Sequence, residues 1–107
     1  MTQATLDAFQ VIADPGRRYM LQLLSKENLT INGLAENFDM SRPAVSKHVK
    51  ILQAAGFITI TDIGRERYCM LRQDGFKELQ DWIGFFDKFW GAKLKKLEML
   101  MNQKAKG

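Results

Sequence analysis

The chain has 107 residues, of which 46% are hydrophobic and 26% charged, a composition that suits one folded domain (1–107) with a modest core. It has neither a run of 18 apolar residues nor a basic N-terminal stretch followed by an apolar one, so we expect no transmembrane span and no secretory signal. A single cysteine, Cys69, excludes an internal disulfide and predicts a reducing, cytoplasmic setting.

The formal net charge of +4 is unevenly distributed along the chain. Residues 1–40 have a net charge of −2, residues 41–72 of +4, and residues 73–107 of +2. A focused basic surface attracts a polyanion, whereas scattered charge only aids solubility. The segment 41–72 is therefore the first candidate for a contact with nucleic acid.

Two short helices are expected before residue 27. The first covers about residues 4–13, where Leu6, Phe9 and Ile12 recur at every third position. Pro15 begins the second, which continues to Lys26. Its first turn contains Arg17 and Arg18, for which two interpretations stay open: an ion pair with an acidic neighbour such as Asp14, or a contact with phosphate.

A helix-turn-helix is predicted over about residues 31–55. Its first helix, 31–38, has apolar residues at helical spacing, and Asp39-Met40 form the turn. Its second helix follows the N-cap candidate Ser41 and ends before Gly56. Two short amphipathic helices joined in this way are typical of DNA-binding proteins.

The second of these helices has two chemically different faces. One is an apolar stripe of Val45, Val49 and Leu52, and the other presents Arg42, Ser46, Lys47, Lys50 and Gln53. An ordinary solvated helix mixes charge signs, whereas a helix that lies against phosphates cannot. The absence of a carboxylate on the polar face therefore favours a nucleic-acid contact over a solvated surface.

A β-hairpin is expected over about residues 57–72. Alternating β-branched residues predict a strand at 57–63, and Gly64-Arg65 is the turn. The returning strand at 66–72 would have Tyr68 and Met70 on one face and Cys69 and Leu71 on the other. Arg65 and Arg67 would lie at the tip of the hairpin. A basic-tipped hairpin after a basic helix predicts a mainly α (α+β) fold, a winged helix-turn-helix with a two-stranded wing.

The last predicted element is one helix over about residues 74–101, roughly 40 Å long, which exceeds what a domain of this size can cover. Five aromatic residues lie close together in it: Trp82, Phe85, Phe86, Phe89 and Trp90. Part of this surface would enter the core, and we expect the surplus to be buried in a second copy of the chain, as aromatic interface residues are.

Three segments of the sequence resemble the ArsR (ArsR/SmtB) family of bacterial winged-helix repressors. They are DPGRRYMLQLL, LTINGLAENFDMSRPAVSKHVKILQAAGFI and GRERYCML, within a match from about Phe9 to Trp90. The resemblance implies a homodimer joined through its first and last helices, which adds Leu6 and Phe9 to the aromatic interface residues above. It also implies binding to an imperfect inverted repeat in double-stranded DNA.

The resemblance further implies which residues contact DNA. At the major groove these would be Ser41, Arg42, Ala44, Ser46, Lys47 and His48. Arg65 and Arg67 would sit at the backbone or minor groove, and the charge pattern adds Lys50 as a phosphate contact.

The metal ligands of the family's metal sensors are missing from the corresponding segments. Residues 29–35 contain no Cys, His or carboxylate, and the last helix contains no His. One His and one Cys cannot supply a tetrahedral nitrogen/sulfur site. The sequence is therefore closer to the metal-free subgroup that includes SdpR-type autorepressors, where repression is relieved by a partner protein or the inducer is unknown, and we expect no cofactor.

The same residues allow three alternatives to a DNA-binding repressor. Catalysis by a Cys69–His48 pair would need an acidified thiol, a cleft and an orienting group, so we expect no enzyme activity. A redox-responsive repressor would need an exposed, low-pKa Cys69. A winged helix that binds protein conflicts with the cation-only face, because interface cores are depleted in charge.

Overall fold

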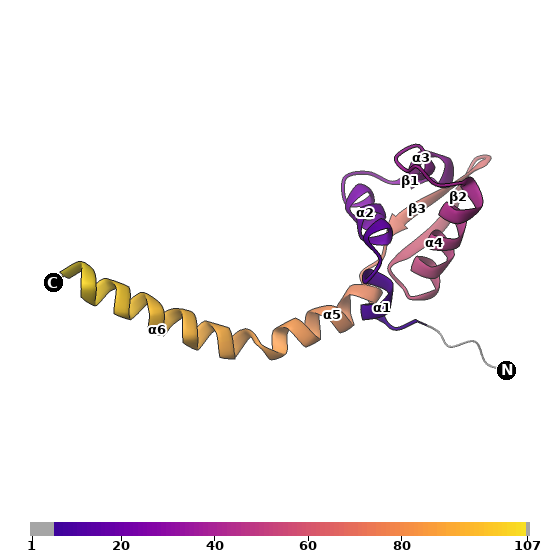
Figure 1. Ribbon diagram of the computed structural model, residues 1–107. Coiled ribbons are helices and arrows are strands. Elements are labelled where there is room, and N and C mark those ends of the chain that lie inside the picture. The colour runs from indigo at the N-terminus through magenta and orange to yellow at the C-terminus, as the bar shows by residue number, and fades with distance from the viewer. Residues whose placement is uncertain (1–5, 107) are drawn as a thin grey trace.

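The computed structural model describes residues 6–106, with side chains as far as Gln103. Figure 1 shows a body formed by the first four helices and a small sheet, from which the last two helices project as an arm, and the molecule is 67 Å in its longest dimension. In chain order the elements are α1 (Ala8–Ile12), α2 (Pro15–Leu24), β1 (Leu29–Thr30), α3 (Ile31–Ala35), α4 (Arg42–Ala54), β2 (Ile58–Ile63), β3 (Glu66–Leu71), α5 (Asp74–Phe85) and α6 (Asp87–Lys106).

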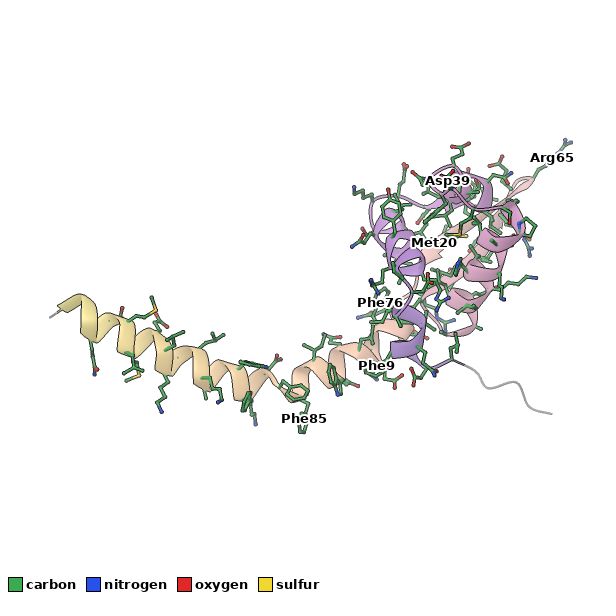
Figure 2. All side chains as sticks on the ribbon, viewed as in Figure 1. Phe9, Met20, Asp39, Arg65, Phe76 and Phe85 are labelled. Atoms are coloured by element: carbon green, nitrogen blue, oxygen red, sulfur yellow. The ribbon has the colours of Figure 1, made fainter. Side chains whose placement is uncertain are left out.

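The core of the body is built from one apolar face of each helix and one face of the sheet. Met20, labelled inside the body in Figure 2, is fully buried on α2. On α4 the predicted stripe of Val45, Val49 and Leu52 is buried against it. Burial of these side chains fixes the orientation of α4, because rotating the helix would expose them at a cost of about 1.5–3 kcal/mol each. The polar face of α4 is thereby directed outward.

Four helices of the body begin with a side-chain N-cap. The carboxylates of Asp7 and Asp14 accept backbone N–H groups of α1 and α2, and the hydroxyls of Thr30 and Ser41 do so for α3 and α4. Each cap stabilises its helix by about 1 kcal/mol. These caps set where each helix starts, which is why α4 begins directly after Ser41, as predicted.

The sheet has three antiparallel strands in the order β1-β3-β2, one more than the predicted two-stranded hairpin. Leu29 and Thr30 pair with Cys69 and Tyr68 on the free edge of β3. The extra strand is only two residues long, too short to show a period-two pattern. On the other side, β2 and β3 pair from Ile58↔Leu71 to Ile63↔Glu66, and Gly64, with φ +65°, takes the first turn position, as in a type II′ hairpin.

The predicted C-terminal helix is interrupted at Phe86. The backbone N–H of Phe86 donates to the carbonyl oxygen of Ile83, three residues earlier, and not to the residue four positions earlier as in a regular α-helix. Gly84 lies within this turn. Glycine weakens a helix and the tighter turn changes its direction, so α5 and α6 meet at the bend visible in Figure 1. At the other end of the chain, α1 is shorter than the predicted helix over 4–13, and positions 4 and 5 lie outside the described residues.

The start of α5 is packed tightly against the body. A Cβ atom on Gly75 would lie 2.7 Å from the ring of Phe57 and 2.9 Å from its backbone nitrogen. Gly75→Ala should therefore lower the free energy of unfolding by about 1–3 kcal/mol, although alanine favours helix. Gly91→Ala, in open space on α6, is the control and should not lower it. Equal urea midpoints for the two variants would contradict this packing.

Candidate nucleic-acid interface

The outward face of α4 presents cations and no carboxylate. Arg42, Lys47 and Lys50 are exposed on it, and Ser46 is half-buried. The helix has no acidic residue between Arg42 and Ala54. Ala44, also half-buried, lies in the first turn, where its N–H donates to the Ser41 hydroxyl over 3.3 Å. Three of the predicted residues of α4, Arg42, Lys47 and Lys50, are therefore exposed, whereas Ala44, Ser46 and His48 are half-buried, and His48 also contacts α2.

Arg42 is held in place by two side chains. Its Nε–H donates to Oδ1 of Asn32 on α3 over 2.7 Å, and Nη1 donates to the hydroxyl of Ser46. These contacts orient the guanidinium before any ligand arrives and leave it exposed. Sequence reasoning did not select Asn32. The available signal was a polar residue between the apolar positions Ile31 and Leu34.

The hairpin brings two further arginines near the start of α4. Arg65 lies at the tip and points away from the body (Figure 2), whereas Arg67 pairs with Asp62 across the hairpin at 3.1 Å. Both members of that pair are exposed, so it adds little stability. A polar hollow of about 470 Å³ joins the two parts of this surface. It is lined by Arg42, Arg65 and Arg67 together with Thr30, Ile31, Asn32, Gly33, Glu36 and Glu66.

His48 makes its contact with the protein interior. Its Nδ1 lies 3.2 Å from Nη1 of Arg17 on α2. A guanidinium can only donate, so in this contact Arg17 is the donor and Nδ1 of His48 the acceptor. His48 is thus tied to α2 through one side of its imidazole.

Among the described residues neither Arg17 nor Arg18 forms an ion pair with Asp14, and Arg17 is too buried to contact phosphate, whereas a phosphate contact of the exposed Arg18 stays a prediction. Both guanidinium groups donate to carbonyl oxygens at the end of α1: Arg17 to Val11 and Gln10, and Arg18 to Ile12 and Ala13. Cations are favoured there because the C-terminal end of a helix carries partial negative charge. The backbone N–H of Arg17 donates to the Asp14 carboxylate and lowers the pKa of Asp14; the charge of Arg17 also lowers that pKa, and burial opposes both effects.

Cys69 is fully buried in the middle of the sheet. Burial raises the pKa of its thiol, and the charge of Arg42 opposes this only in part. An oxidation sensor needs an accessible thiolate. The structure therefore argues against the redox-responsive alternative.

We predict that a thiol reagent such as Ellman's reagent will reach Cys69 only through opening of the body. In the folded protein, labelling should be at least about 100-fold slower than in the same chain unfolded in urea. The rate of absorbance change in the two conditions measures this directly. Comparable rates would restore Cys69 as a candidate sensor.

Apolar side chains predicted to form an interface line one side of α1 and the arm. Phe9 on α1 stacks edge-to-face on Trp82 of α5 with ring centroids 5.5 Å apart, and Trp82 contacts Phe86 at 5.1 Å. Leu6 is half-buried beside the core. An apolar hollow of about 410 Å³ is lined by Trp82, Ile83, Phe86, Asp87, Phe89 and Trp90.

Much of this aromatic surface is uncovered in a single chain. Phe85, labelled in Figure 2, is 78% exposed, and Trp90 is 55% exposed. Exposed Leu94, Leu97 and Leu100 continue the apolar surface along α6. Contiguous exposed apolar surface is typical of interaction sites.

Among the residues that the structure describes, no group of three or more His, Cys, Asp or Glu side chains is arranged to hold a metal ion. Within the same residues, no helix has the length and apolar content needed to cross a membrane.

Comparison with known proteins identifies the family. Residues 14–59, from the N-cap of α2 into β2, match the model of bacterial regulatory proteins of the arsR family. The transcriptional repressor SdpR of Bacillus subtilis is 32% identical over 83 residues, which are 77% of this chain and 92% of that protein. The chain belongs to the ArsR family. A second ArsR-type relative, the HTH-type transcriptional regulator Rv2034 of Mycobacterium tuberculosis, is 34% identical over 78% of this chain and 75% of its own length.

Solved structures of ArsR-family proteins have the same fold. The ArsR family transcriptional regulator RHA00566 superposes with a TM-score of 0.70 at 34% identity, covering 78% of this chain and 87% of that one. A possible transcriptional regulator for arsenical resistance superposes with a TM-score of 0.67 at 40% identity, covering 86% and 93%. The predicted family and winged helix-turn-helix fold are confirmed. This ArsR-family chain is a DNA-binding transcription regulator rather than an enzyme.

Proposed function

We propose that this regulator is a repressor that binds an inverted-repeat operator as a homodimer and needs no metal. The observation that supports DNA reading most directly is the outward face of α4, which is anchored by a buried stripe and presents Arg42, Lys47 and Lys50 without a carboxylate. A helix of this kind fits the major groove, where phosphates flank the base edges. The repressor role is proposed from the likeness to SdpR, which is named a transcriptional repressor.

We assign the contacts in two groups. The N-terminal half of α4 would face base edges, and the rest of the basic surface would face phosphates. The first group is Ser41, Arg42, Ala44, Ser46, Lys47 and His48, and the second is Lys50, Arg65 and Arg67. His48 is the weakest member of the first group, because one ring nitrogen is already engaged by Arg17.

Dimerisation would divide the chain into a DNA-binding part and an interface part. The first comprises the helix-turn-helix at 31–55 and the wing at 57–72, and the second comprises α1 with the arm as far as about residue 101. The exposed aromatic surface supports this division, since its burial needs a second surface of equal character. Interface residues would be Leu6, Phe9, Trp82, Phe85, Phe86, Phe89 and Trp90. A two-fold axis would place half-sites ~10 base pairs apart.

Two consequences concern where the protein acts and what controls it. A regulator of bacterial genes binds chromosomal DNA, so we place this protein in the cytoplasm. Release from DNA would depend on a protein or a small molecule, because residues 29–35 provide no ligand for a soft metal ion.

Zinc, cadmium or arsenite at micromolar concentration is therefore expected to leave the protein–DNA complex intact. The measurement is fluorescence anisotropy of labelled promoter DNA during metal titration, with equilibrium dialysis to count bound metal. Stoichiometric metal uptake accompanied by release of the DNA would overturn the metal-free assignment.

The proposed function is tested by binding to the promoter region of the protein's own gene. Anisotropy titrations with that DNA and with a scrambled duplex should give affinities that differ by about 1,000-fold or more at physiological salt. Retention on heparin that weakens with salt should accompany this. Equal affinity for both duplexes would reject sequence-specific regulation at that site.

A further inference from the structure

A buried arginine connects helices of the body that are distant in sequence. Arg17 on α2 is only 8% exposed. Its Nε–H donates to the carbonyl oxygen of Val11 over 2.7 Å, and Nη2 donates to that of Gln10 over 3.1 Å. Both carbonyls belong to the last turn of α1, so the arginine holds that end of α1 against α2.

The third donor of the same guanidinium reaches α4. Nη1 lies 3.2 Å from Nδ1 of His48, which stands in the middle of α4 between the buried residues Val45 and Val49. One planar group therefore contacts α1 on one side and α4 on the other. The geometry of a guanidinium is rigid, so it relays position better than a flexible ammonium would.

On its other side α1 contacts the base of the arm. Phe9 stacks on Trp82 of α5 with ring centroids 5.5 Å apart, and Figure 1 shows α1 where the body meets the arm. The connection from the arm to α4 thus runs from Trp82 to Phe9, through the backbone carbonyls of α1 that follow Phe9, to Arg17 and on to His48. Arg17 joins its two halves.

We propose that Arg17 is a positioning residue that sets the placement of α4 relative to the dimerisation helices, and that it acts through His48. This inference rests on the proposed homodimer. Two recognition helices must enter successive major grooves, so their separation depends on how firmly each α4 is attached to the interface. Because Arg17 is buried, it cannot itself read the DNA, and any effect on operator choice must pass through the protein.

The experiment compares an operator with native half-site spacing and one with the half-sites moved apart by a single base pair. Arg17→Lys keeps the charge and loses the planar fork, and should reduce the affinity ratio between the two operators by about tenfold. Its affinity for random DNA and its dimeric state should not change. Arg18→Ala is the matched control, because Arg18 also binds carbonyls of α1 but is exposed, and it should keep the ratio.

Variants of His48 test the other end of the link with Arg17 intact. His48→Leu removes the acceptor and should lower the affinity ratio between the two operators. His48→Gln provides an amide oxygen as acceptor and should keep that ratio near the wild-type value. Both expectations concern the ratio and not the overall affinity. In the double variant Arg17→Lys/His48→Leu the ratio should fall no further than in the worse single variant. This pair of His48 variants decides the question if Arg17→Lys does not fold.

Several results would overturn the inference. They are an unchanged spacing ratio in Arg17→Lys, equal ratios in His48→Leu and His48→Gln, or losses that multiply in the double variant. A wild-type protein that is monomeric or binds all duplexes equally would reject the proposed function and this inference together. A wild-type dimer with a clear spacing preference that no variant alters would reject this inference alone.

Discussion

Trp90→Glu is expected to convert the protein to a monomer and to remove most of its affinity for an operator. Trp90 lines the apolar hollow at the bend of the arm, and its ring contacts Phe89 within the chain. A carboxylate there would be buried without a partner at both copies of a two-fold interface. At about 2 kcal/mol or more per aromatic residue and two copies, dimer dissociation should be favoured by roughly 1,000-fold.

Light scattering and operator anisotropy on the same samples measure both effects. Phe86→Glu should act in the same direction, although Phe86 is half-buried within the chain and its loss can also weaken the fold. Gln80→Glu adds the same charge on the polar side of α5, and we expect it to remain dimeric. A Trp90→Glu protein that stays dimeric would refute the interface assignment.

The second large effect is expected for Arg42→Ala. Its guanidinium is oriented by Asn32 and Ser46 at the start of α4, where base edges are within reach. Its removal should cost about 1–3 kcal/mol per half-site and relax the preference at one base position, which we expect to be a guanine. Asn32→Ala, which keeps the guanidinium and removes one support, should cost less.

Arg65→Ala should behave differently, because Arg65 lies at the tip of the wing. We expect weaker binding to operator and random DNA alike, and a salt dependence flatter by about one unit of slope per lost phosphate contact in each half-site. Isotherms for both arginine variants on operator and scrambled DNA, over a series of salt concentrations, separate the two roles. A changed base preference in Arg65→Ala, with random binding intact, would mean that the wing reads sequence.

The helix-turn-helix was predictable because local signals agree there. The N-cap Ser41, the stripe Val45, Val49 and Leu52, and the stop at Gly56, with φ +81°, each specify the same helix, and the structure contains it. The wing was predictable for the same reason, since its β-branched alternation and its Gly-containing turn coincide. Periodicity therefore located the outward cations without knowledge of what they bind.

Other features depend on contacts that no local pattern encodes. The third strand exists because two extended residues meet the free edge of β3, which lies about 40 positions later in the chain. The positions of the Arg17 and Arg18 side chains depend on where α1 ends in space. Both donate to backbone carbonyl oxygens, and because every residue has one, no residue type in the sequence marks these acceptors. The choice of Asn32 as a partner for Arg42 likewise follows from how α3 crosses α4.

The bend at Phe86 shows a different limit. Apolar residues keep their helical spacing from α5 into α6, so a single long helix was the direct prediction. The hydrogen bond from Phe86 to Ile83 spans three residues instead of four and breaks the regular helical pattern near Gly84. The spacing of the apolar residues along the sequence does not reveal this break.

Selection of duplexes from a random-sequence pool, with the number of chains per bound duplex measured by light scattering, shows whether this protein reads DNA as a homodimer. We expect a two-fold symmetric motif with half-site centres ~10 base pairs apart, bound by two chains. The Arg42→Ala protein, carried through the same selection, should return a motif with one relaxed position in each half. Recovery of an asymmetric motif bound by one chain, or of no enriched motif, would contradict the proposal that this protein reads DNA as a homodimer through α4.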